Sequence, residues 1–429
     1  MTLITFLGIG NYTETTYNPC DFSNLPQPQH TDPQPLTSRF FSAALAKWTH
    51  PVRILVITTQ DASNKHEKEL RKELTGYEVE FFQLPLQTGT ESDLWDYFQV
   101  LTENLCKGEN IIADITHGFR STPIVTLLAL TYLRMTRAVQ VHGLYYGAFD
   151  AVPRDYPLKP TFDLSPFLSL LQWTSAAESF FETGDATQIS HLIEHTQRNL
   201  WANKTLSKSE NPRNLTPLAR TLRETSANLR TLRLQDLSTS ASELKTKSDA
   251  AETEIDQFLP PFGHLIKLIA DELIAHREAG LSSRKNSESN LPEETDLQAQ
   301  LDLIRWLLAK GHPVSALTLA REWIVTAFAA HLRPAPPFPL VYSERKPFEA
   351  ILNYRTNPKA KKQSLDEDLL AKSEELPPTL LATFETLWSQ TTGPRNDLNH
   401  ANHNDKSHKA SALRDKVSEL VAAFPTLIP

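Results

Sequence analysis

Short apolar runs alternate with longer amphipathic stretches up to about residue 160, and this alternation strongly limits the folds open to the chain. The apolar runs predict strands at Leu3–Ile9, Arg53–Thr58, Glu78–Leu84, Asn110–Ile115 and Val139–Tyr146. The stretches between them predict helices at Ser38–Lys47, Asn64–Thr75, Glu91–Leu105 and Ser121–Thr136. Strands that alternate with helices form crossover units, which build a mainly parallel sheet covered on both faces. Such sheets bind ligands at the carboxyl ends of their strands.

From Asp163 onward no strand is predicted, and apolar residues recur at helical spacing. We expect helices at Ser165–Glu182, Ala186–Asn203, Pro217–Leu234, Phe262–His276, Leu301–Leu308, Pro313–His331 and Lys409–Phe424. One apolar seam is made of Leu215, Leu218, Leu222, Leu229 and Leu232. This seam either packs within its own subunit or forms a dimer contact. The polar stretch Gly280–Pro292 is typical of a surface loop.

Length and charge narrow the classes of protein further. A chain of 429 residues with 40% hydrophobic residues is long enough for two or three domains. Its net charge of −8 argues against a protein that coats nucleic acid, yet leaves room for an enzyme with a local basic patch. Two cysteines are too few for a disulfide framework. No basic leader precedes the apolar start, and no apolar run could span a bilayer, so we expect a cytoplasmic protein without a membrane anchor.

The segment Asp114–Ser121 (DITHGFRS) lies where a ligand-binding loop of such a sheet should be. It follows an apolar strand and precedes an apolar helix, and its glycine allows a tight turn. Thr116, Arg120 and Ser121, together with the amides at the start of the helix, can hold a phosphate. Phe119 either stacks on a base or anchors the loop in the core, and we favour the core.

Other strand ends offer similar groups. Gly10, Asn11 and Tyr12 follow the first predicted strand, Thr58, Thr59 and Gln60 the second, and Tyr146 ends the last. Small, hydroxyl and amide groups at several strand ends suit a large ligand with phosphates and several rings. The dinucleotide fingerprint lacks its third glycine, because Thr13 stands there, and no GxxxxGK[ST] loop occurs. Redox chemistry and ATP hydrolysis are therefore disfavoured.

A second motif lies near the C-terminus, where Arg395, Asn396 and His400 follow Gly393-Pro394. Metal-free RNA cleavage needs a histidine that moves protons and an arginine that stabilises charge on the phosphate. The proline predicts that Arg395 stands at the start of a helix. Alone the pair is weak, because Arg137 and His142 have the same spacing in an apolar stretch. The spacing of His400, His403 and His408 completes no familiar metal site, so no metal is expected.

Two further groups of charged residues bear on the rear half. Basic residues interleaved with rings suit either a groove for single-stranded RNA or a solvated loop. They are Arg345, Lys346, Phe348, Tyr354, Arg355, Lys359, Lys361 and Lys362. Arg321, Glu322 and Trp323 lie on an apolar helix, where we expect a structural ion pair with the motif loop rather than a catalytic role.

The segment Asp114–Arg120 resembles the DxTHGFR signature of CRISPR-associated proteins with an N-terminal CARF domain and a C-terminal HEPN ribonuclease domain. The resemblance extends to Leu144–Ala148 and to Asp163–Asp185, with Trp173 and Thr183-Gly184-Asp185. It ends with Arg395, Asn396 and His400, and residues 203–290 carry no motif of the family.

The resemblance implies an α/β Rossmann-like CARF sensor at 1–162, an all-α connector at 163–300 and an all-α HEPN domain at 301–429. In this family a CARF dimer binds a cyclic oligoadenylate made by type III complexes, with cyclic tetra-adenylate as the default ring. The implied ligand-binding residues are Gly10, Asn11, Tyr12, Thr58, Thr59, Gln60, Thr116, His117, Gly118, Phe119, Arg120, Ser121 and Tyr146.

The paired HEPN domains of the family cut single-stranded RNA without a metal and leave a 2′,3′-cyclic phosphate. Arg395, Asn396 and His400 would be the catalytic residues. The implied assembly is a homodimer or a higher even oligomer, with no cofactor beyond the activator and no stable DNA binding. Two alternatives stay open: a non-catalytic regulator that binds RNA or a partner, and a CARF domain that also degrades its own activator.

Overall fold

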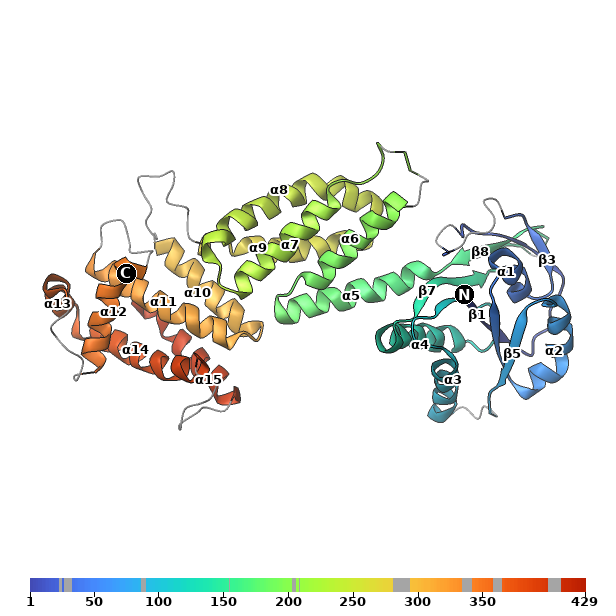
Figure 1. The fold of residues 1–429 in the computed structure, drawn as a ribbon, viewed down its shortest axis with the longest axis horizontal. Helices are drawn as coiled ribbons and strands as arrows, with labels where there is room; N and C mark the ends of the chain where they lie inside the picture. Colours follow the sequence, from blue (N-terminus) through green and yellow to red (C-terminus); the bar gives the residue numbers. More distant parts are fainter. Residues whose placement is uncertain are drawn as a thin grey trace. The chain divides into compact units, whose positions relative to one another are not determined.

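A computed structural model describes residues 1–22, 25–26, 33–85, 90–153, 155–202, 206–207, 209–280, 294–333, 342–357, 365–399 and 410–429. The chain forms two compact units, residues 1–172 and 173–429 (Figure 1). The finer division of the rear half at residue 300 stays a prediction. No helix in the described ranges is both long and apolar enough to cross a lipid bilayer.

The first unit is built on an eight-stranded sheet in the order β3-β2-β8-β7-β6-β1-β4-β5. The strands are β1 (Thr2–Leu7), β2 (Thr15–Asn18), β3 (Leu36–Ser38), β4 (Arg53–Thr58), β5 (Glu78–Gln83), β6 (Asn110–Asp114), β7 (Gln140–Gly147) and β8 (Lys159–Asp163). β7, β6, β1, β4 and β5 pair in parallel, and β8 runs antiparallel to β7. The predicted Rossmann-like α/β class is confirmed.

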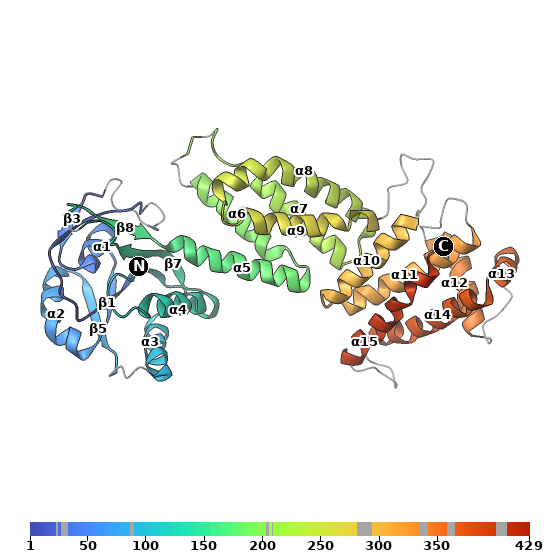
Figure 2. The same cartoon turned by 180° about the vertical axis from the view of Figure 1, so that it is seen from behind.

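Helices cover both faces of this sheet. They are α1 (Phe41–Thr49), α2 (Gln60–Glu73), α3 (Glu91–Asn104) and α4 (Thr122–Arg137), of which α3 and α4 lie side by side (Figure 2). Alternate residues of β1 face opposite cores, as a strand buried on both sides requires. Leu3 and Leu7 pack with α1 and α2, whereas Ile4 and Phe6 pack with α3 and α4.

The second unit is helical. Its helices are α5 (Ser165–Thr183, which begins in the first unit), α6 (Thr187–Ala202), α7 (Leu215–Arg230), α8 (Leu234–Phe258), α9 (Gly263–Ala275), α10 (Glu294–Ala309), α11 (Pro313–Leu332), α12 (Tyr342–Thr356), α13 (Glu367–Glu374), α14 (Pro378–Asn399) and α15 (Ala410–Ala422). Short 3-10 turns lie at Arg277–Ala279 and Phe424–Leu427. The predicted all-α rear half is confirmed.

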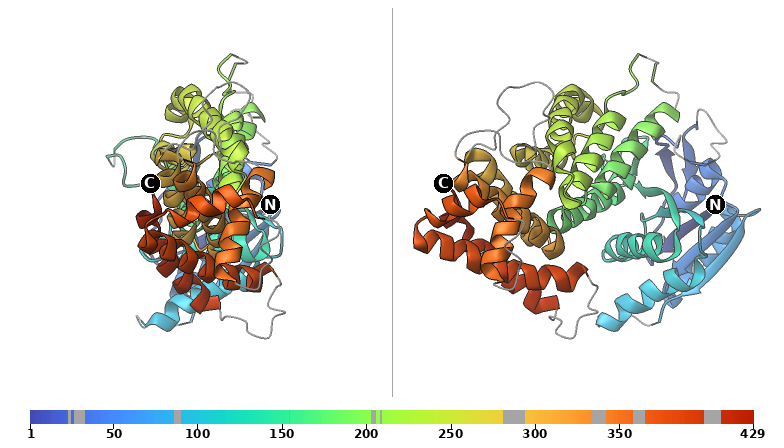
Figure 3. Two further views of the ribbon diagram at one scale, coloured as in Figure 1. Left: turned by 90° about the vertical axis from the view of Figure 1, so that its left-hand side faces the viewer. Right: turned by 60° about the vertical axis from the view of Figure 1, so that its left-hand side comes forward.

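The leucine seam of α7 packs inside its own chain. Leu215, Leu218, Leu222 and Leu229 are fully buried, and α7 lies between α6 and α8 (Figure 3). The within-subunit interpretation of the seam is therefore the right one.

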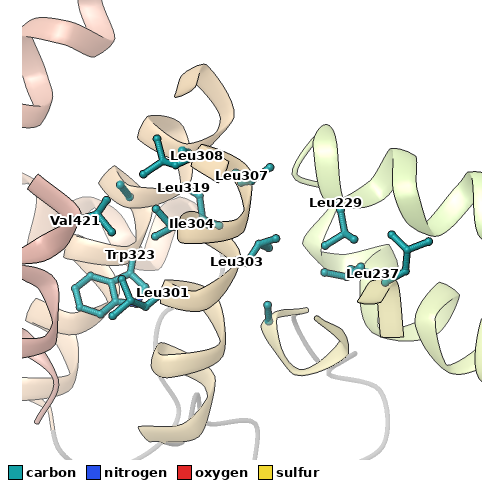
Figure 4. Packing of buried hydrophobic residues seen from close by; sticks show 14 of the residues in the cluster. Leu229, Leu237, Leu301, Leu303, Ile304, Leu307, Leu308, Leu319, Trp323 and Val421 are labelled. Carbon is teal, nitrogen blue, oxygen red and sulfur yellow. The ribbon is translucent and has the colours of Figure 1, made fainter. Parts of the chain in front are cut away.

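One hydrophobic cluster runs through the second unit from Trp173 to Leu427. In Figure 4, leucines of α10 lie among Trp323 and Val421 on one side and Leu229 and Leu237 on the other. Connector and C-terminal helices thus share one core.

The helix that carries the C-terminal motif begins earlier than predicted. α14 starts at Pro378, so Pro394 lies inside the helix and Arg395 near its C-terminal end. The prediction that Arg395 begins a helix was wrong. Phe384 and Trp388 are buried in the core, and their packing carries the helix through a dipeptide that in isolation favours a start.

Candidate ligand-binding site

A cavity of about 670 Å³ opens at the carboxyl ends of the parallel strands of the first unit. Its volume is in the usual range for sites that bind small molecules. Eleven predicted ligand residues line it: Gly10, Asn11, Tyr12, Thr58, Thr59, Gln60, Thr116, His117, Gly118, Phe119 and Tyr146. The other two, Arg120 and Ser121, are exposed and adjoin the lining at Phe119.

Tyr12 closes the turn that follows β1. Its hydroxyl accepts a hydrogen bond from the amide of Gly8 at 2.8 Å and donates to the carbonyl of Gly8 at 3.1 Å. Burial raises the pKa of this phenol to about 12, so the ring is neutral and serves as a rigid wall of the cavity.

Side chains from outside the turn fix its backbone. Lys65 Nζ donates to the carbonyl of Ile9 at 3.0 Å, and His66 Nε2 lies 2.7 Å from the carbonyl oxygen of Gly10. Arg39 donates to the carbonyl of Tyr12 at 3.1 Å. These three contacts hold the backbone of the turn where its residues line the cavity.

Asp114, at the end of β6, shapes the DITHGFRS loop rather than contacting the cavity. Its buried carboxylate accepts hydrogen bonds from Thr5 Oγ1 at 2.7 Å and from the amide of Thr116 at 2.8 Å. Burial raises its pKa to about 6, although the hydrogen bonds act in the opposite direction. Thr116 Oγ1 in turn accepts from the amide of Gly147, which joins the loop to the end of β7.

Gly118 is required by its conformation and by its neighbours. Its φ of +112° is strained for any residue with a side chain. A Cβ there would lie 3.0 Å from Thr122 Oγ1 and 3.3 Å from the Cβ of Phe6. The turn leaves Phe119 52% exposed at the cavity, so the predicted core position for this ring was wrong.

Among the side chains of the loop, His117 alone has a buried polar atom without a hydrogen-bond partner. Its ring meets Tyr12 edge-on at 4.6 Å between centroids, and Tyr12 meets His66 in the same way at 4.7 Å. Nε2 of His117 is enclosed and has no hydrogen-bond partner among the described residues. Burial, and secondly the charge of His66, lowers the pKa of His117 to about 4, so its imidazole is neutral in the wall of the cavity.

Sequence reasoning missed some cavity residues. Arg39 and Phe149 line the cavity but lie in segments without a predicted strand or motif. Arg39 follows β3, a three-residue edge strand with no apolar alternation that could have signalled it. Phe149 lies two residues beyond the end of β7. The expectation that residues after a strand end bind the ligand would have included it if the window had been two residues longer.

The C-terminal motif is placed only in part. The backbone of Arg395 and Asn396 is part of α14. His400 lies outside the described residues, as do His403 and His408. These catalytic assignments stay predictions.

The basic segment of the second unit is largely engaged in packing. Phe348 is fully buried, Arg345 pairs with Glu322 at 3.1 Å, and Arg355 pairs with Glu385 at 2.7 Å. These three residues therefore do not form an RNA groove. Lys359, Lys361 and Lys362 lie outside the described residues.

Arg321 pairs with Glu349 of α12 and stacks on Trp388 of α14, with 4.4 Å from its guanidinium carbon to the ring centroid. Arg321 and Glu322 thus join α11 to α12 and α14. The ion pair that we predicted to reach the motif loop lies elsewhere, because α12 packs against α11.

Two comparisons bear on identity. Residues 2–150 match the family of the CRISPR system endoribonuclease Csx1, CARF domain. The N-terminal domain is of the CARF type. Residues 169–276 match the family of CRISPR-associated protein MJ1674, second domain.

CRISPR-associated protein MJ1674 of Methanocaldococcus jannaschii is 31% identical to this chain over 113 residues. That stretch covers 26% of this chain and 18% of the relative, so the chain matches less than a fifth of the relative's length. Together the matches support a CRISPR-associated protein with a CARF domain at its N-terminal end.

Proposed function

We propose that this chain is a cyclic-oligoadenylate-activated endoribonuclease that cuts single-stranded RNA without a metal ion in type III CRISPR defence. The observation that carries the proposal is the 670 Å³ cavity at the strand ends of a CARF-type domain. The domain is similar to that of a protein described as a CRISPR system endoribonuclease.

The cavity has the chemistry that an adenylate ring needs. The hydroxyls of Thr59 and Thr116 suit phosphates, and Arg39, which also pairs with Glu69 at 2.6 Å, adds a cation. Phe119 and Phe149 give rings on which bases can stack. A ring of four nucleotides exceeds a single cavity of this size, so two cavities facing each other would share it.

The outer face of α4 is the surface on which a second copy would dock. Its exposed positions are Ile124, Leu128, Tyr132, Met135 and Thr136, none of them charged. A two-fold contact places a patch against its own copy, so a face without charge avoids repulsion. The face begins just beyond Phe119, so this docking would bring two cavity rims together.

Leu128→Glu tests the dimer in the full chain by light scattering. We expect the dimer mass to fall to the monomer mass, whereas Glu419→Lys, on α15, leaves it unchanged. A Leu128→Glu protein that keeps the dimer mass would rule out this face.

The C-terminal motif would supply the chemistry. The 2′-oxygen attacks the phosphorus and the P–O5′ bond breaks, leaving a 2′,3′-cyclic phosphate and a 5′-hydroxyl. His400 takes the 2′-proton or returns a proton to the 5′-oxygen, Arg395 stabilises charge on the phosphate oxygens, and Asn396 orients the phosphate. A dimer would place two such sets around one phosphate.

The decisive experiment incubates the full chain with labelled RNA, with and without cyclic tetra-adenylate, and in EDTA. We expect cleavage that the ligand stimulates and EDTA leaves intact. RNA that stays whole with ligand would overturn the enzyme and favour the non-catalytic regulator, and loss of cleavage in EDTA would overturn the metal-free mechanism.

A second activity, slow cleavage of the activator by the CARF domain, is favoured by His117. Its neutral imidazole lines the cavity, and its enclosed, unpartnered Nε2 would accept the 2′-proton of the ring after the side chain turns toward it. Chromatography of cyclic tetra-adenylate after incubation with His400→Ala tests this, because that variant lacks the proposed RNA site. A ring recovered whole after long incubation excludes the activity.

A further inference from the structure

The turn Thr183-Gly184-Asp185 at the end of α5 is held by the turn between α10 and α11. Lys310 Nζ donates to the carbonyl oxygen of Phe181 at 2.6 Å, and His312 Nε2 lies 2.7 Å from the carbonyl oxygen of Thr183. The last carbonyls of a helix have no partner within the helix. Lys310 and His312 therefore cap the C-terminal end of α5 from another part of the chain.

Lys310 is buried for a lysine, with its side chain 10% exposed. Its Nζ also pairs with Glu272 at 2.8 Å, and Glu272 accepts from Trp306 Nε1 at 2.7 Å. A solvated lysine would suffice for a surface contact. This one has a fixed position, set by a carbonyl, a carboxylate and the surrounding rings.

The turn itself leaves no room for adjustment. Gly184 has φ +70°, and a Cβ on it would overlap the ring of Trp306. Asp185 pairs with Arg230 at 2.8 Å, and the carbonyl of Arg230 accepts from Ser315 Oγ on α11 at 2.9 Å. A displacement of the end of α5 must therefore displace the start of α11 or break these contacts.

The opposite end of α5 is bonded to a strand of the ligand cavity. Ser165 Oγ accepts from the amide of Leu144 on β7 at 3.0 Å, and the amide of Leu164 donates to the carbonyl of Leu144 at 2.7 Å. β7 ends at Tyr146 and Gly147, which line the cavity. α5 is one helix of 19 residues, so the residue bonded to that strand and the residues capped by Lys310 and His312 belong to the same element.

α11 continues to the helix that carries the proposed catalytic residues. Phe328 of α11 meets Phe384 of α14 at 5.1 Å between ring centroids, and Arg321 stacks on Trp388. Arg395 follows Trp388 on the same helix.

We infer that Lys310 and His312 are positioning residues that couple ligand in the cavity to the nuclease helices, through the capped end of α5. The inference rests on the proposed function. Among the described residues, neither side chain is bonded to the cavity lining or to α14, so their loss leaves both sites with their own contacts. A hydrogen bond from a charged donor is strong. We therefore expect the loss of one to lower the ratio of stimulated to unstimulated cleavage by roughly 10- to 100-fold.

The test compares Lys310→Met and His312→Ala with the original chain and with Lys245→Met. Lys245 is a matched control, because it forms an exposed ion pair with Asp249 on α8. Three quantities are measured with cyclic tetra-adenylate: the dissociation constant, RNA cleavage without ligand, and the ratio of stimulated to unstimulated cleavage.

We expect both variants to bind the ligand within about twofold of the original chain and to keep unstimulated cleavage, while the stimulation ratio falls by roughly 10-fold or more. Lys245→Met keeps the ratio. Unchanged stimulation in both variants overturns the coupling role, and so does an equal loss of stimulated and unstimulated cleavage, which marks a purely structural cap. If the original chain is not stimulated, the proposed function fails and the inference falls with it.

Discussion

Replacing Asp114 with asparagine should stabilise the first unit at neutral pH. The carboxylate is fully buried between Thr5 and the amide of Thr116. Asparagine has the same shape: its Oδ1 can accept from the amide while its Nδ2 donates to the hydroxyl oxygen of Thr5. The substitution therefore keeps two hydrogen bonds and removes a buried ionisable group.

The size of the effect follows from the raised pKa of Asp114. Its value of about 6 in the fold lies roughly two units above the unfolded value near 3.9, which corresponds to about 3 kcal/mol. A raised folded pKa means that the unfolded chain releases its proton first. The benefit of the protonated acid is therefore complete below pH ~4 and lost as the pH rises through ~6.

Hydrogen–deuterium exchange of β1 and β6 amides measures the stability of this unit in the full chain. At pH 8 we expect the free energy of opening of these amides to be up to about 3 kcal/mol higher in Asp114→Asn than in the original chain. At pH 4 we expect a smaller difference. Asp249→Asn, at an exposed ion pair on α8, is the control and should change nothing there. A difference that stays constant from pH 4 to pH 8 would refute the reasoning, as would lower protection at pH 8.

Three further predictions concern the two sites. Gly118→Ala should cost about 1–3 kcal/mol, because it strains a φ of +112° and crowds Thr122. Thermal melting checks this against Gly10→Ala, where a Cβ meets open space. Arg120→Ala should raise the concentration of cyclic tetra-adenylate for half-maximal RNA cleavage. An unchanged concentration would show that Arg120 is not a contact. His400→Ala should lower stimulated cleavage by ~10²–10⁴ while calorimetry finds the same ligand affinity, and near-normal cleavage would remove His400 from the mechanism.

The central strands were predictable from the sequence because burial on both faces demands continuous apolar runs. Arg53–Thr58 has the predicted bounds, and its neighbours differ by one or two residues at their ends. β2 and β3 could not be predicted, because strands of three or four residues carry too little pattern. α8 was missed because its pattern is also weak. Its few buried residues are separated by many Ser, Thr, Lys and Glu residues over 25 positions.

Strand-end logic found most of the cavity because the carboxyl ends of parallel strands meet at one edge. For Phe119 the favoured core position was wrong, because the ring that follows the positive-φ Gly118 is exposed at the cavity. Strand-end logic could not find Arg39, which reaches the cavity from a distant segment by bonding to the turn at Tyr12. Such contacts depend on tertiary packing and leave no local signal.

The single core of the second unit has a consequence for how such proteins can be assembled from parts. Trp173 stacks on Phe262 at 4.5 Å, and residues from α7 and α8 share their cluster with α10, α11 and α15. A gene fusion that exchanged the C-terminal helices alone would leave apolar faces of α7 and α8 without their partners. A fusion near Gln172 leaves this core whole. The first unit is therefore exchangeable at a junction within α5, whereas the helices of the second unit must be inherited together.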